Sequence, residues 1–179
     1  MGLAARRSGF STDLIPSADK PQMSVVRLLR PDAALLSLLE GYDCEAFGSV
    51  ALRSYDLAVM AEAGAIYLAR VQDEIVGSCQ LLRVFDEPSF CYVVGFYIRT
   101  PWRGNGLGRA FLEELAAKCR GMGAEGMMLT VSPTNEAAMG LYRGAGFVEE
   151  AFVPHFYGEG EDRYILRWRF ETGDLPGGV

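Results

Sequence analysis

The most informative stretch of this chain is Tyr97-Ile98-Arg99-Thr100-Pro101-Trp102-Arg103-Gly104-Asn105-Gly106-Leu107-Gly108-Arg109. It connects an apolar strand pattern to an amphipathic helix pattern that starts near Leu107. The three glycines leave room for several backbone N–H groups to converge at the positive N terminus of that helix. The stretch therefore predicts a loop that cradles a pyrophosphate group.

Two other kinds of phosphate loop do not fit this stretch. A dinucleotide fingerprint, GxGxxG, needs a third glycine where this chain has Arg109 or Phe111, depending on the starting glycine. A Walker loop needs Gly-Lys-Ser or Gly-Lys-Thr, and the stretch contains neither. A glycine-rich turn without a ligand stays open as the simpler alternative.

Periodicity and turn residues around the loop predict an α/β domain with the order β-α-α-β-β-β-α-β-α-β-β. Apolar runs predict strands, and apolar residues at three- and four-residue intervals predict helices. The expected strands are 25–29, 65–71, 75–85, 90–98, 127–131, 148–156 and 162–170, the last two joined by a turn at 158–161. The expected helices are 33–40, ended by Gly41, then 54–63, capped by Ser54, then 107–122, and then a helix from about Thr134 or Asn135 to Ala145, ended by Gly146.

Length and composition suit a single domain, since the chain has 179 residues of which 50% are hydrophobic. We expect a flexible extension at 1–22, the folded domain at 23–171 and a frayed tail at 172–179. The net charge of −6 argues against broad binding to nucleic acid, which needs a basic surface. It favours a cationic or amine-bearing partner.

Histidine and cysteine usage predicts no metal site. His155 is the only histidine, and Cys44, Cys79, Cys91 and Cys119 form no CxxC pair. Dispersed cysteines without a secretory leader favour a reduced, cytoplasmic protein. No apolar run approaches the ~18 residues of a membrane span.

A second pattern lies in the helix after the strand 127–131. Asn135 and Tyr142 are seven residues apart, which is two helical turns, so their side chains share a face and can address one extended ligand. A tyrosine hydroxyl there could deliver a proton to a departing thiolate. The alternative is a core aromatic with a hydrogen-bonded hydroxyl group.

Together the two patterns resemble the GNAT superfamily of acetyl-CoA-dependent N-acetyltransferases. The residues that carry the resemblance are Arg103-x-x-Gly106-x-Gly108, Asn135 through Leu141-Tyr142, and Gly144-Ala145-Gly146-Phe147. The likeness extends from about Val76 to Phe170, and the front part from Val25 also fits. It implies a mixed central sheet.

The resemblance implies acetyl-CoA as cosubstrate and assigns roles to individual residues. Backbone amides of the loop would hold the pyrophosphate of coenzyme A, and they belong to Arg103, Gly104, Asn105, Gly106, Leu107, Gly108 and Arg109. Phe96 and Ile98 would pair their main chain with the pantetheine arm in a notch between splayed strands, and Asn135 would bind the same cofactor. Tyr142 matches the family's usual general acid.

The sequence His155-Phe156-Tyr157-Gly158-Glu159-Gly160-Glu161-Asp162-Arg163-Tyr164 resembles the hairpin of the branch that acetylates protein N termini, including the ribosomal-protein alanine acetyltransferases. That branch has a glutamate base where this chain has Thr130, whose hydroxyl cannot serve as a base. The candidate bases are Glu45, Glu149, Glu150 and His155, and water is a further alternative.

These patterns predict transfer of an acetyl group from acetyl-CoA to a primary amine, either a small amine or a peptide or protein N terminus, by direct attack. The alternative is an inactive acyl-CoA-binding sensor or interaction domain. Transfer through Cys91 or Cys119 is less favoured, because both lie in apolar runs without an adjacent base. The expected partners exclude nucleic acid and membrane, and the oligomeric state stays open, a homodimer included.

Overall fold

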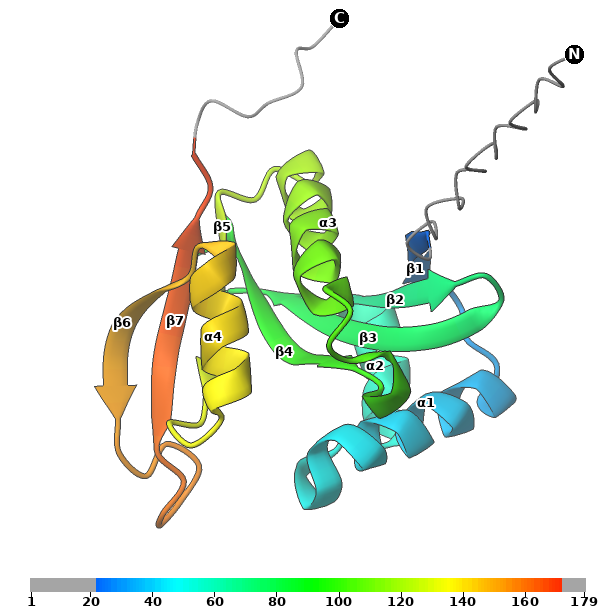
Figure 1. Cartoon of the computed structure of the whole chain (residues 1–179), viewed down its shortest axis with the longest axis horizontal. Coiled ribbons are helices and arrows are strands. Elements are labelled where there is room, and N and C mark those ends of the chain that lie inside the picture. Colours follow the sequence, from blue (N-terminus) through cyan, green and yellow to red (C-terminus); the bar gives the residue numbers. More distant parts are fainter. Residues whose placement is uncertain (1–21, 172–179) are drawn as a thin grey trace, which may run out of the picture.

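The computed structural model describes residues 22–171, which form a seven-stranded sheet flanked by helices (Figure 1). The predicted extension 1–22, apart from Gln22, and the predicted tail 172–179 lie outside the described residues. The strand order is β1-β2-β3-β4-β5-β7-β6. Within the described range no helix is both long and apolar enough to cross a membrane.

The element order confirms the predicted α/β fold class with a mixed central sheet. The strands are β1 (Met23–Leu28), β2 (Ala65–Val71), β3 (Glu74–Arg83), β4 (Phe90–Ile98), β5 (Gly126–Val131), β6 (Val148–Val153) and β7 (Arg163–Arg169). The helices are α1 (Ala33–Phe47), α2 (Ser54–Ala63), α3 (Leu107–Gly121) and α4 (Glu136–Ala145), with short 3₁₀ turns η1 (Gly48–Val50) and η2 (Thr100–Trp102).

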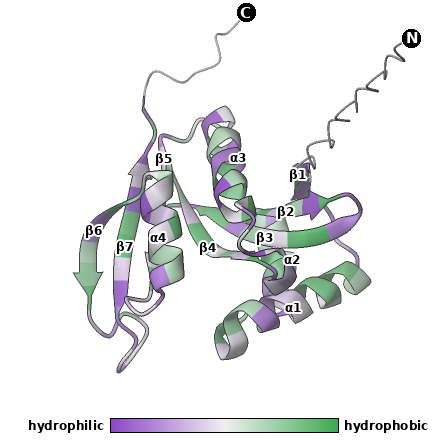
Figure 2. Ribbon diagram, in the orientation of Figure 1, coloured by the Kyte–Doolittle hydropathy of each residue, from purple (hydrophilic) through white to green (hydrophobic). Residues whose placement is uncertain are grey.

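Helices cover both faces of the sheet (Figure 1). Side chains of a strand point alternately to its two faces, and β2 divides between two cores accordingly. The core under α3 and α4 contains Ala65, Tyr67, Ala69 and Val71. The core under α1 and α2 contains Ile66 and Leu68. Figure 2 shows hydrophilic and hydrophobic residues mixed along α3, as the predicted amphipathic pattern requires.

Helix α1 is longer than predicted, and the expectation that Gly41 ends it is wrong. The helix continues to Phe47 and ends at Gly48, whose φ of +61° is a left-handed conformation that favours glycine. A glycine inside a helix costs only about 1 kcal/mol relative to alanine, and packing of Leu39 in the core under α1 offsets that cost. The extra residues carry α1 to the edge of the site described below.

The predicted capping role of Ser54 is also wrong. Ser54 is the first residue of α2, and its hydroxyl donates to Glu40 of α1. Arg53 occupies the cap position, and its backbone N–H donates to Asp56 at 2.9 Å. The bonds from Ser54 hold the pKa of Glu40 below its usual value. The Ser54 hydroxyl, which the local pattern assigned to capping the N terminus of α2, therefore donates its hydrogen bond to a carboxylate of α1 instead.

Strand β6 is shorter than the predicted 148–156 and ends at Val153. The connection to β7 spans residues 154–162, longer than the predicted turn. Pro154 has no N–H to donate to a strand ladder, and His155 has a φ of +54°. Both features stop the extended conformation and produce a longer loop.

A notch opens in the middle of the sheet. Strands β4 and β5 run parallel and pair only over Phe90–Tyr92 with Gly126–Met128. The register between β3 and β4 then shifts, which leaves Val94 as an extra residue in β4, a β-bulge that bends the strand. Beyond it, β4 continues to Ile98 and β5 to Val131 without pairing with each other. This separation is the splay that the family resemblance implied.

Candidate active site

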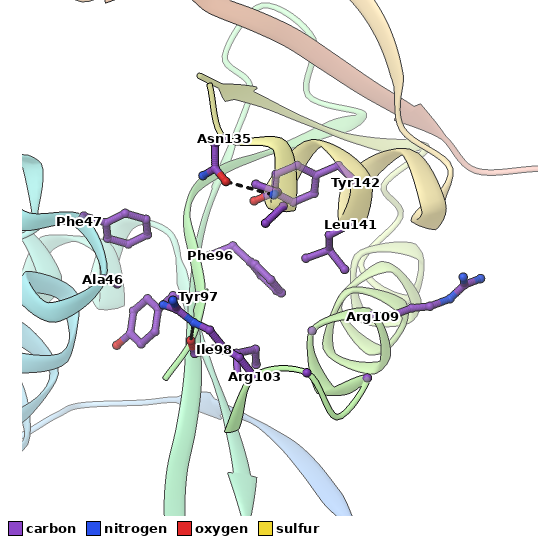
Figure 3. Close-up of a pocket in the computed structure, with 15 residues that line it drawn as sticks. Ala46, Phe47, Phe96, Tyr97, Ile98, Arg103, Arg109, Asn135, Leu141 and Tyr142 are labelled. Carbon is purple, nitrogen blue, oxygen red and sulfur yellow. Dashed lines mark hydrogen bonds between the residues drawn. The ribbon is translucent and has the colours of Figure 1, made fainter. Parts of the chain in front are cut away.

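A cavity of about 450 Å³ lies beside the notch (Figure 3). Its walls come from the end of α1, from β4, from the loop that begins α3, and from α4. The residues expected at the site that line it are Phe96, Ile98, Arg103, Gly104, Gly106, Gly108, Arg109, Asn135 and Tyr142. The structure thus brings both sequence patterns to one cavity.

The loop between β4 and α3 presents a row of free backbone N–H groups. Those of residues 104–109 donate to no acceptor within residues 22–171, and Ala110 is the first that bonds into α3, to the Gly106 carbonyl at 3.2 Å. Gly104 and Gly106 have φ values of +80° and +77°, and a Cβ on either would meet no atom within 4 Å. Free N–H groups, open space and the helix dipole together suit an anion such as pyrophosphate.

The side chains of Arg103, in this loop, and Arg109, in the first turn of α3, are engaged within the protein. Arg103 Nε donates to the Ile98 carbonyl at 2.7 Å, and Arg109 Nε donates to Glu113 at 2.9 Å. Figure 3 shows the Arg109 side chain directed away from Tyr142 and Phe96. The geometry favours the backbone N–H of Arg109, rather than its guanidinium group, as the contact to an anion.

The side chains of Asn105 and Leu107 are placed outside this cavity. Leu107 is buried in the core, and Asn105 Nδ2 donates to the Arg103 carbonyl at 3.3 Å. Both border a second cavity of about 440 Å³, beside Met23. Contacts from these two positions to a cofactor in the first cavity would therefore rest on their backbone amides.

Asn135 lies at the N terminus of α4 and caps that helix. Its carboxamide oxygen accepts the Ala138 N–H at 3.1 Å, which satisfies one of the free donors of the first turn (Figure 3). Its Nδ2 group is then the part of the side chain that a ligand in the cavity can use. The seven-residue spacing brings Tyr142 to the same cavity, as predicted.

Tyr142 is a buried aromatic with its ring between Phe96 and Phe147. The ring centroids lie 6.3 and 5.5 Å apart, both in edge-to-face geometry. Burial raises the pKa of the Tyr142 hydroxyl, because the charged phenolate is poorly solvated there. The hydroxyl therefore stays protonated at physiological pH and is suited to donate a proton rather than to accept one.

A chain of three hydroxyl groups joins β4, β5 and the β6–β7 loop. Tyr92 and Tyr157 each lie 3.2 Å from the Thr130 Oγ1 atom, one through each hydroxyl. Burial raises the pKa of Tyr92 to about 12. Thr130, which cannot act as a base alone, thus links two phenols beside the splay between β4 and β5.

The four candidate bases do not contribute to the cavity walls. Glu149 is paired with Arg143, and Glu150 with Arg167 at 3.1 Å. Of the other two, His155 Nδ1 accepts the Gly160 N–H at 3.0 Å, and Glu45 is exposed on α1, next to the lining residue Ala46. None of the four is among the described residues that line the cavity.

Several lining residues were not among the site residues predicted from the sequence, although some of them lie within the quoted motifs. They are Ala46 and Phe47 of α1, Tyr97 of β4, and Ala137, Ala138 and Leu141 of α4. The helical period predicts that the α4 residues share one face, because Leu141 and Tyr142 lie three and four positions after Ala138. Ala46 and Phe47 carry no such signal, because they reach the cavity only through the extension of α1 past Gly41.

Residues 33–147, more than half of the chain, match the acetyltransferase (GNAT) family. The protein belongs to the GNAT family. This finding confirms the resemblance seen in the two sequence patterns. It explains why the glycine loop, the splayed strands and α4 occur together in this chain.

Relatives of this GNAT protein include an uncharacterised protein of Mycobacterium leprae, 38% identical over 101 residues that cover 55% of this chain and 27% of the relative. An N-alpha-acetyltransferase of Sulfolobus acidocaldarius is 30% identical over 112 residues, which cover 57% of this chain and 67% of the relative. The chain thus spans about a quarter of the length of the first relative and about two thirds of the second.

Two solved structures show the same GNAT fold. The ribosomal-protein-S18-alanine N-acetyltransferase of Escherichia coli superimposes with a TM-score of 0.69 and 18% identity, over 86% of this chain and 99% of that chain. An acetyltransferase of Bacillus subtilis in complex with CoA has a TM-score of 0.68 and 17% identity, over 84% of this chain and 100% of that chain.

Proposed function

We propose that this protein transfers the acetyl group of acetyl-CoA to a primary amine, a small amine or a peptide N terminus, by direct attack of the amine. The observation that carries the proposal is the single cavity that joins the free N–H groups of residues 104–109, the β4 segment beyond its pairing with β5, and Tyr142. Membership of the GNAT family and the fold shared with a CoA-bound acetyltransferase support it.

The residues of the cavity fit coenzyme A in a defined direction. When bound, acetyl-CoA supplies the reactive thioester. The loop amides hold its pyrophosphate, and the Asn135 Nδ2 group is available to the same ligand. The main chain of Phe96 and Ile98 pairs with the pantetheine arm, which fixes the thioester, and backbone N–H groups there polarise its carbonyl. The Tyr142 hydroxyl donates its proton to the departing sulfur.

The hydroxyl chain provides an outlet for the proton of the attacking amine. Each hydroxyl can donate one hydrogen bond while accepting another, so the three groups of Tyr92, Thr130 and Tyr157 can hand a proton to solvent. The outlet matters near neutral pH, where an amine is mostly protonated and only its neutral form attacks. We assign this role to the chain because it lies beside the splay between β4 and β5 and because no carboxylate or imidazole lines the cavity among the described residues; the three hydroxyl-bearing residues lie outside the cavity lining as well.

Thr130→Val tests the outlet, because valine keeps the shape of threonine and removes both hydrogen bonds. We expect kcat/KM for the amine to fall about tenfold near pH 7, with unchanged affinity for acetyl-CoA. This loss is smaller than the loss that usually follows removal of a directly acting general base. The loss should shrink at a pH above the pKa of the amine, where no proton has to be removed before attack. Steady-state kinetics across this pH range measures both effects.

Thr134→Val is the matched control, since Thr134 is exposed and its hydroxyl bonds only to Ser132 within the described chain. It should leave the pH profile unchanged. Equal losses for both variants, or a Thr130→Val loss that does not depend on pH, would show that the hydroxyl chain only stabilises the fold.

The function itself is tested by acetyl-CoA consumption in the presence of a panel of monoamines, diamines and short peptides with free N termini. Acetylated product, identified by mass, is expected for at least one class. Binding of CoA without turnover of any amine would support the alternative, an inactive acyl-CoA-binding domain.

A further inference from the structure

Residues 99–103 take no part in the proposed chemistry, but they connect two parts of the chain that do. This segment, which we call the η2 turn, lies between the end of β4, which lines the cavity, and the glycine loop. The Trp102 N–H donates to the Arg99 carbonyl at 2.9 Å, and the Arg103 N–H donates to the Thr100 carbonyl at 3.3 Å. Arg103 Nε also donates to the Ile98 carbonyl (Figure 3). The free N–H groups begin at the next residue, so the η2 turn determines where they lie relative to β4.

One carboxylate outside the η2 turn fastens it to the sheet. Glu74, the first residue of β3, accepts through a single oxygen from Arg99 Nη1 at 2.8 Å and from the Trp102 indole N–H at 3.3 Å. Arg99 Nη1 also donates to the Ile75 carbonyl at 3.0 Å, and the Arg99 backbone N–H donates to the Val76 carbonyl at 2.8 Å. Side chains from both ends of the turn therefore meet at one oxygen atom of β3.

The Arg99 side chain also reaches the wall of the cavity that α1 provides. Its guanidinium group is largely buried and lies over the Tyr42 ring, 4.1 Å from the ring centroid. Tyr42 is about one helical turn before Ala46, which lines the cavity. Glu74 thus holds a guanidinium group that contacts α1 as well as β3. Ion pairs at the surface usually contribute little to stability, so removal of Glu74 should move these parts more than it changes the free energy of unfolding.

We infer that Glu74 is a positioning residue for cofactor binding. It holds the η2 turn so that the free N–H groups of the glycine loop and the main chain of β4 beyond its pairing with β5 address one acetyl-CoA molecule. This inference rests on the proposed function. Glu74 is not among the described residues that line the cavity, and it acts through Arg99 and Trp102. Its removal should therefore weaken acetyl-CoA binding and leave the groups around Tyr142 in place.

The charge of Glu74 makes the inference sharply testable, because position and charge have opposite effects on affinity. Acetyl-CoA is an anion, so the removal of a nearby carboxylate favours its binding by long-range electrostatics alone. Loss of the position that Glu74 holds weakens binding. A decrease in affinity after this carboxylate is removed therefore reports a displaced loop.

Glu74→Ala removes both hydrogen bonds to the η2 turn. We expect the Kd for CoA and the KM for acetyl-CoA to rise about fivefold, as the loss of one net hydrogen bond allows. The kcat at saturating acetyl-CoA and the Tm should change little. Glu74→Gln keeps an acceptor oxygen without the charge, so it should bind CoA as tightly as the wild type or more tightly. Calorimetric titration, steady-state kinetics and melting curves measure these values.

Asp73→Ala is the matched control, because it removes the neighbouring carboxylate, which is paired with Arg70 at 3.7 Å rather than with the η2 turn. It should not raise the Kd for CoA. Unchanged or tighter binding in Glu74→Ala overturns the inference. An equal rise of Kd in Glu74→Gln also overturns it, since the charge rather than the held position would then be responsible. A fall in Tm together with kcat would indicate a general folding defect and would count against it too.

If the wild type binds no CoA, the proposed function fails, and hydrogen exchange of the ligand-free proteins then decides the role of Glu74. The backbone N–H groups of Trp102 and Arg103 are bonded within the η2 turn. They should exchange faster in Glu74→Ala than in the wild type and in Asp73→Ala, because the turn loses its attachment to β3. Equal exchange in the three proteins overturns the inference.

Discussion

Tyr142→Phe is expected to lower the turnover of acetyl transfer about 10²-fold with little change in acetyl-CoA affinity. The substitution keeps the ring and its contacts with Phe96 and Phe147 and removes only the hydroxyl. Because burial holds the pKa of Tyr142 above its usual value, the hydroxyl stays protonated near neutral pH and can act as a proton donor there. The measurement is kcat at saturating acetyl-CoA, together with the Kd for CoA.

The matched control is Tyr67→Phe. Tyr67 is 4% exposed and belongs to the same core as Tyr142, but its hydroxyl lies 3.8 Å from the Met122 sulfur, away from the cavity. Its loss should leave kcat unchanged. Normal turnover in Tyr142→Phe would show that this residue is a packed core aromatic, and loss of CoA binding would show that its role is structural.

Gly106→Val is expected to abolish the thermal stabilisation that acetyl-CoA provides. At about a hundred times its Kd, a ligand of the native state contributes about 2.7 kcal/mol, or roughly 5–10 °C in Tm for a domain of this size. Valine at a φ of +77° is strongly disfavoured, so the loop must change conformation, and its side chain enters the space beside the free N–H groups. Melting curves with and without acetyl-CoA measure the shift.

Gly123→Val controls for the backbone strain itself. Gly123 has a φ of +76° and open space around its Cα, as Gly106 has, but it lies in the turn between α3 and β5. Both variants should lose similar intrinsic stability, and only Gly123→Val should keep the ligand-induced shift. An undiminished shift in Gly106→Val would place the cofactor elsewhere.

The elements with strong local signals were predicted correctly. The apolar period of α3 is set by Phe111, Leu112 and Leu115, all fully buried, and β4 was predicted at its observed bounds. Asn135 caps the N terminus of α4 with its side chain, and Gly146 ends the helix in a left-handed backbone conformation. Such signals act within a few residues, so the chain alone reveals them.

The errors arose where a distant contact competes with a local rule. Gly41 would end a marginal helix, but α1 is held by packing beyond it and stops at Gly48 instead. Ser54 has the chemistry of a cap, but Glu40 accepts its hydroxyl. Neither the helix packing nor the carboxylate can be read from residues next to these positions.

The same distinction divides the site. The sequence by itself predicted a loop with free backbone N–H groups, because glycine spacing and a helix start determine where such groups lie, and the helical period predicted that Asn135 and Tyr142 share one side of α4, where both line the cavity. Only the tertiary structure decided the splay of β4 from β5, the hydroxyl chain through Thr130 and the burial of Asp43. These features join segments tens of residues apart. Their hydrogen bonds and burial depend on how helices and strands pack, which no local pattern encodes.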